Sequence, residues 1–459
     1  MRRIAAFCLL TISTAALAQP TPDPARKKAE RDLFEQIVEI PTVEGRTAEF
    51  RKLTALLTAE FRKAGITNIV VKDHDKTQTL IARWPAAKPS GRKPILLMAH
   101  MDVVEAKASD WKNPPFEFRE EKGYYLGRGA SDNKAALTGI VLALQNLKRS
   151  SFRPGRDIIV LFTGDEESAG NGARRAATEW RSLIDAEYAL NGDSGGGMVY
   201  KDGRLDAFYM QIAEKTFADY RLTAVNKGGH SSQPRPDNAI YALAGALKQV
   251  EQYRFQPMIN SATRAFFERI ADNDKGSYGE LIRKWLADPM DRETADLLEA
   301  NQIGYTRTRC VATMLSGGHA TNALPQKAEA NVNCRVFPGV KLEDLRRELQ
   351  SIAGQDVTVA LVDSSPASDV SPVRADIVDA YRAAVGTRFK DASIIPIQSA
   401  WATDGAYLRS NGMPVYGVGG LWSQLAEPSG IHGLNERVLI DGFHGQVPIW
   451  EEILRRLAG

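Results

Sequence analysis

Cysteine is scarce in this chain, with 3 residues among 459. Cys8 lies near the N-terminus, and beyond it only Cys310 and Cys334 remain. Two cysteines cannot form a disulfide scaffold, although these two could pair with each other, and the chain has no C-x-x-C motif. Any metal would therefore have to be held by histidine and carboxylate side chains.

An excess of charge of either sign is also lacking, since 59 Lys and Arg face 56 Asp and Glu. This near balance excludes the basic footprint that nucleic-acid binding requires. No stretch beyond the N-terminus approaches ~20 uninterrupted apolar residues, so we expect no stable membrane anchor. With 43% apolar residues, a globular protein large enough for two domains is expected.

The N-terminus has the pattern of a signal peptide. Arg2 and Arg3 precede a short apolar run from Ile4 to Leu17, and Ala16-Leu17-Ala18 matches a signal-peptidase site. Removal of residues 1–18 takes away two arginines, so the net charge of +3 falls to 3 − 2 = +1. A buried N-terminal helix is the alternative. We expect an exported protein, periplasmic or secreted, whose mature chain begins near Gln19.

Two patterns of apolar residues follow one another along the chain. Continuous apolar runs at 94–100 and 157–163 predict buried strands, and a helix is predicted over 135–147. Such alternation is typical of an α/β domain with helices on both faces of its sheet. An α+β pattern follows, with expected elements at 209–225 (strand), 238–252 and 263–300 (helical), 310–315 and 328–336 (strands), 342–352 (helix) and 357–362 (strand). It resembles an inserted domain, with residues 364–372 as the linker back.

Residues that could carry chemistry lie at or just beyond the ends of these strands. In His100-Met-Asp102 the histidine can bind a metal through one ring nitrogen while Asp102 accepts a hydrogen bond from the other. The glycine-rich segment from Gly127 to Lys134 presents Asp132 just before a helix. A carboxylate here can bridge two cations, and capping of the helix is the alternative.

Three more segments add carboxylates and a second histidine. Glu166 and Glu167 follow the strand at 157–163, where adjacent acids repel unless a cation or a shared proton relieves them. One glutamate can bind metal while the other takes a proton from water, and a solvated acidic turn is the alternative. Asp193 and His432 each lie in a glycine-containing turn.

Together these residues have the composition of a two-metal site. Two histidines and three carboxylates can supply two three-ligand sites when one carboxylate is shared, which leaves open positions for water and substrate. Zinc accepts histidine and carboxylate ligands together, and a catalytic zinc needs an open position. Two metals ~3.5–4 Å apart generate a nucleophile and hold the reacting oxygen.

The order and wording of these motifs resemble the zinc-dependent carboxypeptidase/aminoacylase family, which includes carboxypeptidase S and aminoacylase. The matching phrases are Ala99 to Val104, Gly127 to Lys134 and Gly164 to Glu167. The resemblance implies an α/β catalytic domain (19–212 and 371–459), whose mixed, mostly parallel sheet is flanked by helices. It also implies an inserted α+β lid and dimerisation domain (213–370).

The resemblance further implies a role for each residue. Two zinc ions per chain are expected, with Co²⁺ or Mn²⁺ as substitutes. His100 and Asp193 would hold one ion, Glu167 and His432 the other, and Asp132 would bridge them. Asp102 would orient His100, Glu166 would be the general base, and the Asp132–Asn133 peptide bond would be cis. Asp193 departs from family members that carry glutamate there, which leaves the substrate subclass open.

Within the inserted domain three residues match the family. His230, in Lys227-Gly-Gly-His-Ser-Ser, would stabilise the oxyanion, often from a partner subunit, and a turn histidine is the alternative. Asn322 and Arg335 would bind the substrate carboxylate, because an arginine fork recognises carboxylates; a structural ion pair is the alternative for Arg335. His319 and His444 receive no role. The helical stretch at 263–300 resembles the longer members, such as carboxypeptidase S.

The sequence therefore predicts a hydrolase that cleaves a peptide or N-acyl amide bond next to a carboxylate-bearing amino acid. Its partners would be a small peptide or N-acyl amino acid substrate and a second copy of the chain. An aminopeptidase or dipeptidase on the same scaffold is the alternative, and it would need an acid to anchor a free amino group. A metal-binding protein without activity is a remote alternative, because none of the predicted ligands is missing and Glu166 is present.

Overall fold

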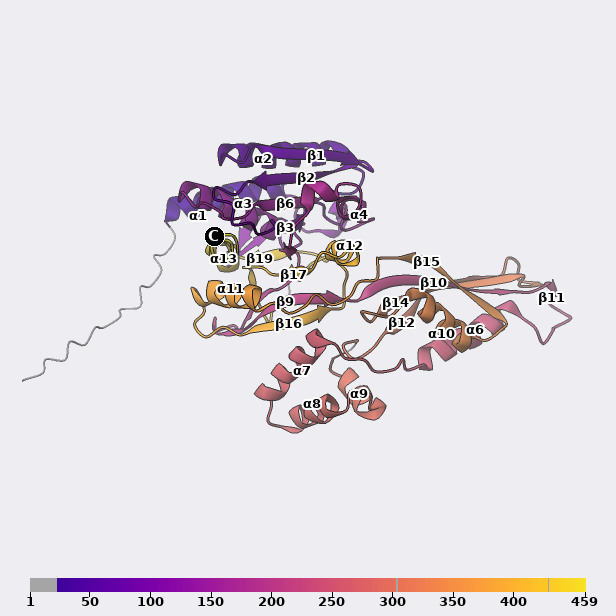
Figure 1. Ribbon diagram of the computed structural model, residues 1–459. Coiled ribbons are helices and arrows are strands. Elements are labelled where there is room, and N and C mark those ends of the chain that lie inside the picture. Colours follow the sequence, from indigo (N-terminus) through magenta and orange to yellow (C-terminus); the bar gives the residue numbers. More distant parts are fainter. Residues whose placement is uncertain (1–22, 303, 428) are drawn as a thin grey trace, which may run out of the picture.

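The computed structural model describes residues 23–302, 304–427 and 429–459 (Figure 1). The predicted signal peptide, residues 1–18, lies outside these described residues. Among the helices that are described, none combines the length and the apolar composition needed to cross a membrane.

A mixed sheet of ten strands forms the centre of the fold, in the order β1-β2-β6-β3-β7-β17-β9-β8-β18, with β16 beside β9. β3, β6, β7 and β17 run parallel to one another, and β9 runs against β17. The strands are β1 (Asn68–His74), β2 (Thr77–Trp84), β3 (Ile95–His100), β6 (Ile158–Thr163), β7 (Tyr188–Asn191), β8 (Gly196–Val199), β9 (Leu205–Glu214), β16 (Ile394–Ser399), β17 (Val415–Gly417) and β18 (Trp422–Gln424).

Helices cover both faces of this sheet, as predicted. Along β3, Ile95 and Leu97 belong to one buried apolar cluster and Leu96 and Met98 to another. The first cluster includes side chains of α1 (Pro24–Val38), α2 (Thr47–Lys63), α3 (Lys134–Arg149), α11 (Ala375–Gly386) and α13 (Ile440–Ala458). The second includes side chains of α4 (Asn171–Ala177), α5 (Arg181–Ile184) and α12 (Gly405–Ser410). Burial on both faces explains the continuous apolar sequence of β3 and β6.

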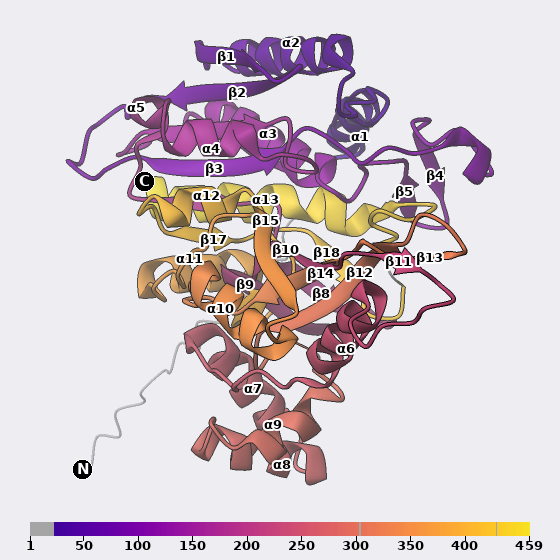
Figure 2. The same cartoon turned by 90° about the vertical axis from the view of Figure 1, so that its right-hand side faces the viewer.

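A second, antiparallel sheet has the order β12-β14-β10-β15 and extends away from the central sheet (Figure 1). Its strands are β10 (Thr216–Val225), β12 (Arg309–Gly317), β14 (Lys327–Val336) and β15 (Val357–Ser364), and the helices α6 (Ala239–Gln252) and α10 (Leu342–Ala353) contribute to its core. β11 (Gly229–His230) pairs with β13 (Ala323–Leu324). This pair, here called the tip, lies at the end of the sheet far from β3 (Figure 1), and Figure 2 shows β11 and β13 side by side.

The segment predicted as one strand over 209–225 is two strands in different sheets. The chain leaves β9 at Glu214 and enters β10 at Thr216, so Lys215 joins the two sheets. Burial is nearly continuous along β9 but alternates along β10, because helices cover one face of the second sheet and both faces of the first. No glycine or proline separates the two strands in the sequence, so the apolar pattern predicted a single strand.

A second connection runs beside the first. After β15 the chain returns toward the central sheet, and the backbone N–H of Ser365 donates to the carbonyl of Phe217 at 3.0 Å. Farther on, the N–H of Ser371 donates to the carbonyl of Ile212 at 2.8 Å. The outgoing and returning segments are therefore hydrogen-bonded to each other on both sides of Lys215.

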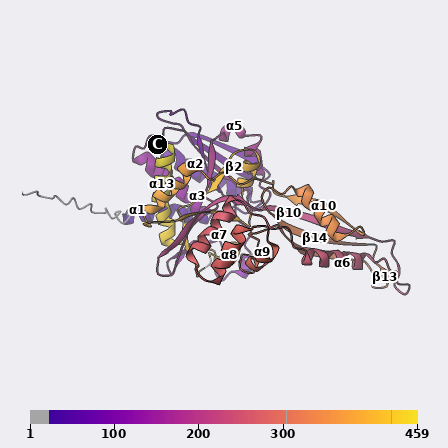
Figure 3. The same ribbon diagram turned by 60° about the horizontal axis from the view of Figure 1, so that its bottom comes forward.

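The predicted helical stretch forms a small unit of its own, set apart from the long strands (Figure 3). It comprises α7 (Ser261–Asn273), α8 (Ser277–Ala287) and α9 (Arg292–Glu299) around a separate apolar cluster that includes Phe267 and Trp285. α7 packs against β16 of the central sheet. Glu299, the last residue of α9, bonds to Arg309 at the start of β12, so this unit contacts both sheets.

The remaining elements are a short 3-10 helix and a three-stranded sheet in the order β19-β5-β4. Their bounds are η1 (Ala108–Asp110), β4 (Arg119–Glu121), β5 (Tyr124–Leu126) and β19 (Arg437–Leu439). His444 in α13 lies between Tyr125 Oη (3.0 Å) and Glu30 Oε2 (2.6 Å). It therefore joins β5, α1 and α13 as a buried structural residue.

Cys310 and Cys334 form a disulfide between directly paired positions of β12 and β14. The pairing that the cysteine count left open is thus confirmed. The bond lies one residue from Arg335, on the strand that carries it.

Candidate active site

The parallel strands of the central sheet bring most of the predicted ligands together. β3 and β6 pair in parallel, as do β3 and β7, so their carboxyl ends meet at one edge of the sheet. His100 ends β3, Glu166 and Glu167 follow β6, and Asp193 follows β7. This edge is a common position for sites in open α/β sheets.

Asp132 lies between the two histidines. Its Oδ1 is 2.8 Å from Nε2 of His100 and its Oδ2 is 3.3 Å from Nε2 of His432. Each carboxylate oxygen therefore faces one imidazole, which is the arrangement required of a carboxylate that bridges two cations. Asp132 does not cap α3, since the N-cap residue is Asn133 and no side-chain cap bond is present there. The Asp132–Asn133 peptide bond is cis, as expected.

The other predicted ligands divide between the two histidines. Glu167 Oε2 lies 2.9 Å from His432 Nε2, and Asp193 Oδ1 lies 3.3 Å from His100 Nε2. Donor atoms of His100, Asp132 and Glu167 come within 4.8 Å of one another, and so do those of His100, Glu166 and Asp193. The five predicted ligands thus form one cluster with Glu166 beside it.

Asp102 connects this cluster to the two glutamates. Nδ1 of His100 lies 3.0 Å from the carbonyl oxygen of Asp102 and 3.4 Å from its Oδ1. The same carboxylate accepts the backbone N–H of Glu166 at 3.2 Å and that of Glu167 at 2.9 Å. Asp102 therefore orients the imidazole and also holds the turn after β6 next to it.

The charges of the cluster perturb its titration. Burial, with the nearby charge of Asp193, raises the pKa of Glu166 well above its usual range. Burial likewise raises the pKa of Asp193 to about 6, against the opposing effect of His100. Hydrogen bonds with Asp132 and then Glu167 raise the pKa of His432 to about 10. The cluster thus contains more carboxylates than histidines that could neutralise them.

This donor set fits divalent cations. A cation placed among the carboxylates would offset the repulsion that raises the pKa of Glu166 and Asp193. Imidazole nitrogen and carboxylate oxygen are ligands that zinc and the other first-row metals accept. A magnesium or calcium site would instead be built from oxygen donors.

The residues of the second sheet do not join this cluster. His230 is exposed at the tip, directly opposite Ala323, and the backbone N–H of Ser231 donates to the carbonyl of Asn322 at 3.0 Å. Arg335 lies at the other end of β14, opposite Phe217 at the start of β10. The eight residue steps from Lys327 to Arg335 span about 26 Å in a strand. Asn322 and Arg335 of one chain therefore cannot hold one carboxylate in this conformation.

Arg335 has the surroundings of an anion receptor. Its guanidinium lies 5.4 Å from the ring centre of Phe217. Burial lowers its pKa, against the opposing charge of Asp219. Over residues 23–302, 304–427 and 429–459, no salt bridge to Arg335 is found, whereas the facing Arg309 is bonded to Glu299 at 2.8 Å. A structural ion pair for Arg335 is thus not seen.

Sequence reasoning overlooked three residues that touch this site. Asn133 donates through Nδ2 to Asp193 Oδ1 at 2.8 Å. Glu436 accepts the backbone N–H of Asp132 at 2.9 Å. Asp404 accepts a hydrogen bond from Thr163 and lines a small cavity with Glu166 and His100. Asn133 and Glu436 belong to segments already singled out for their ligands, but Asp404 lies far from any motif and its sequence context carried no signal.

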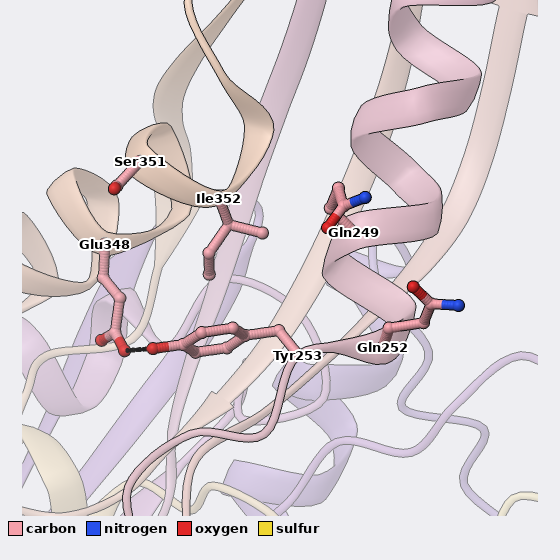
Figure 4. A pocket seen from close by; sticks show the side chains of 6 residues that line it. All are labelled: Gln249, Gln252, Tyr253, Glu348, Ser351 and Ile352. Atoms are coloured by element: carbon pink, nitrogen blue, oxygen red, sulfur yellow. Dashed lines mark hydrogen bonds between the residues drawn. The ribbon is translucent and has the colours of Figure 1, made fainter.

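A larger pocket, of about 420 Å³, lies away from this site, between α6 and α10. Its lining includes Tyr253, whose hydroxyl donates to Glu348 at 2.6 Å (Figure 4). No predicted catalytic or metal-binding residue lines it, so this pocket is not the reaction site.

Comparisons with known proteins agree with the geometry. The sequence pattern of Peptidase family M20/M25/M40 matches residues 96–456. Human N-fatty-acyl-amino acid synthase/hydrolase PM20D1 is 26% identical over 452 residues, which are 93% of this chain and 87% of the human protein. Pig aminoacylase-1 is 27% identical over 437 residues, covering 93% of this chain and 94% of that protein.

The fold is shared with the M20 family metallo-carboxypeptidase Sso-CP2 from Sulfolobus solfataricus. The TM-score is 0.68 at 18% identity, covering 93% of this chain and 98% of that one. The family match extends over most of the chain and takes in every predicted site residue. The chain therefore belongs to peptidase family M20/M25/M40 and is a hydrolase that acts on peptide or N-acyl amino acid bonds.

Proposed function

We propose that this chain is a co-catalytic two-zinc hydrolase that releases a carboxylate-bearing amino acid from an acyl group. The observation that carries the proposal is the position of Asp132, with one carboxylate oxygen toward His100 and the other toward His432. His100 and Asp193 would hold one ion, and Glu167 and His432 the other. Co²⁺ or Mn²⁺ could substitute for zinc, since both accept the same donors.

Bound zinc would polarise the scissile carbonyl and lower the pKa of water. The proton transfers fall to Glu166, which lies beside the ligands and carries no basic partner of its own among the hydrogen bonds of the site. Its raised pKa suits a group that takes a proton from the attacking water. Glu166 then gives this proton to the leaving nitrogen, so that the amine departs neutral and the carboxylate is restored.

Arg335 would bind the carboxylate of the leaving amino acid. The half-buried guanidinium, to which the described residues supply no salt bridge, favours this role, because substrate would supply the missing charge. His230 and Asn322 are neighbours at the tip, so they would act together. Since they lie far from Arg335 in the same chain, they would reach a site either after lid closure or from a second subunit.

The acyl group would be apolar. Ile431 is 48% exposed and Leu434 54% exposed on the loop that carries His432. Large apolar side chains exposed next to a reaction site favour an apolar ligand. The name of the human relative, an N-fatty-acyl-amino acid synthase/hydrolase, points in the same direction. N-acyl amino acids with a long acyl chain are therefore the proposed substrate class.

The carboxylate preference is tested by Arg335→Lys. Lysine keeps the charge but loses the planar fork, so kcat/KM for N-acyl amino acids with a free carboxylate should fall about tenfold to hundredfold, equivalent to about 1.5–3 kcal/mol. Amidated substrates should be poor for the parent enzyme and change little in the variant. Rates are measured over short and long acyl chains with zinc-loaded protein.

Arg221→Lys is the matched control, because Arg221 is exposed and faces Asn331 farther along the same two strands. It should behave as the parent. Cleavage of dipeptides with a free amino group, without cleavage of N-acyl amino acids, would instead support an aminopeptidase or dipeptidase. A zinc-loaded parent that cleaves no substrate of either kind would support the non-catalytic alternative.

A homodimer is proposed through the second sheet. β12 is an edge strand and leaves Val311 61%, Met314 71% and Leu315 71% exposed. Exposed apolar residues on an unpaired edge are typical of a surface that another chain covers. This arrangement would let the tip of one subunit approach the metal cluster of the other.

A mixing experiment tests whether His230 acts across this interface. Glu166→Gln chains and His230→Ala chains should each be nearly inactive, and their heterodimers should regain activity because one composite site has both groups. Activity is followed after mixing, and mass spectrometry verifies that subunits have exchanged. Exchange without recovery would show that His230 acts within its own chain or has no catalytic role.

The division of the chain follows the same proposal. The segments 19–212 and 371–459 would form the catalytic domain and 213–370 the lid, which would close on substrate about Lys215. Export by the N-terminal leader, to the periplasm or the medium, is the proposed localisation.

A further inference from the structure

The buried side chain of Glu436 joins the loop that carries His432 to the loop that carries Asp132. Glu436 Oε1 accepts the backbone N–H of Ser131 at 2.8 Å and that of Asp132 at 2.9 Å. Its Oε2 accepts the backbone N–H of Gly129 at 2.9 Å. Three amides of the Asp132 loop thus converge on one carboxylate.

Arg128 completes the contact from the other side. Its Nη1 donates to Glu436 Oε2 at 2.7 Å and its Nη2 donates to the carbonyl of Gly433 at 3.0 Å. The carbonyl of Glu436 also accepts the N–H of Gly127 at 3.0 Å. The two loops are therefore bonded through both side chains and backbone, and His432 directly precedes Gly433, one of the residues that make these bonds.

We propose that Glu436 is the positioning residue of the metal centre, in that it sets where the Asp132 carboxylate lies relative to both histidines. The backbone amide of Asp132 is held directly, and Glu436 is four residues from His432 on the same loop. A shift of the Asp132 loop would move its carboxylate away from His100 and His432 together. In this role Glu436 acts through the Asp132 loop, to which its carboxylate is bonded.

The number of bonds that Glu436 accepts distinguishes this role from ordinary loop stability. Each oxygen of the Glu436 carboxylate accepts two hydrogen bonds. Oε1 accepts the N–H groups of Ser131 and Asp132, and Oε2 accepts the N–H of Gly129 and Nη1 of Arg128. A glutamine would place an amide N–H₂ where an acceptor is required, so at least two of these donors would lose their partner. Residues that orient a ligand in this way change metal affinity by ~10–100-fold when replaced.

The test is a zinc titration of Glu436→Gln against a chromophoric chelator, with thermal unfolding of the zinc-free protein in parallel. Because Asp132 is shared, we expect both zinc equivalents to bind ~10–100-fold more weakly, and excess zinc should restore part of the activity. Glu427→Gln is the matched control, since Glu427 is a partly exposed residue of the same loop region paired with Arg437 at 3.5 Å. It should bind zinc as the parent does.

Parental zinc affinity in a Glu436→Gln protein that merely unfolds at lower temperature would overturn the proposal. Arg128→Lys serves if the first variant does not fold, because it retains the positive charge and leaves the three backbone amides on Glu436. It should keep zinc affinity within about threefold of the parent, and a ~10–100-fold loss would show that the ion pair, not the amide contacts, does the positioning, which would overturn the proposal. The inference rests on the proposed two-zinc site. A parent that binds no zinc refutes that site, whereas two parental zinc ions with an unaffected Glu436→Gln refute this inference alone.

Discussion

Glu166→Gln should abolish nearly all activity while leaving zinc binding close to that of the parent. Glutamine has the size of glutamate but cannot accept the proton of the attacking water, and loss of a general base costs ~10²–10⁴-fold in rate. Glu166 has the electrostatic surroundings this role requires, because burial and the charge of Asp193 raise its pKa. Metal content and kcat measured on the same preparation separate catalysis from binding.

The neighbouring glutamate provides the contrast. Glu167→Gln should weaken zinc binding, because Glu167 lies 2.9 Å from His432, and added zinc should recover part of its rate. Glu179→Gln replaces an exposed glutamate outside the site and should match the parent. If Glu166→Gln lost zinc and Glu167→Gln lost only turnover, the two roles would have to be exchanged.

Asp132→Ala should remove both zinc ions at once. No other carboxylate of the cluster approaches both histidines with separate oxygens, so its loss deprives each ion of a ligand. The fall in affinity should exceed the ~10–100-fold typical of residues that only orient ligands. Zinc content per chain after dialysis, measured by mass spectrometry, checks the outcome.

Asp193→Ala is the informative comparison for this variant, because Asp193 lies near His100 only. Asp193→Ala should weaken the binding of one zinc equivalent and leave the binding of the other unchanged. Full zinc content and activity in Asp132→Ala would disprove the bridging role.

Part of the ligand cluster could be predicted because its residues directly follow buried strands that the sequence reveals. Residues that follow buried parallel strands must meet at one edge of the sheet, so His100 and Glu167 were identifiable from their positions after the strands predicted at 94–100 and 157–163. Asp132, Asp193 and His432 were singled out as polar residues in glycine-containing segments, and their individual roles as ligands came from the family resemblance. The fold was predictable for the same reason, since continuous apolar runs separate doubly covered strands from the alternating strands of the second sheet.

What escaped prediction depends on contacts between segments distant in sequence. Glu436 reaches Asp132 across 304 positions, and Asp404 reaches Thr163 across 241. A single acid in a loop carries no periodicity that would reveal such a partner. The separation of Asn322 from Arg335 was overlooked although the strand predicted over 328–336 implies it, because an extended strand places its two ends far apart.

The paired connections beside Lys215 restrict how the two sheets can move. If a single chain segment joined the two sheets, one sheet could rotate about all three axes relative to the other. Two crossings, hydrogen-bonded to each other through Ser365 and Ser371, act as two adjacent pivots, and the α7–α9 unit adds a further contact with both sheets. Twisting would shear these bonds, whereas bending about the line between the pivots preserves them. Opening and closing should thus trace one arc, along which Arg335, near the pivots, moves little and the tip sweeps farthest.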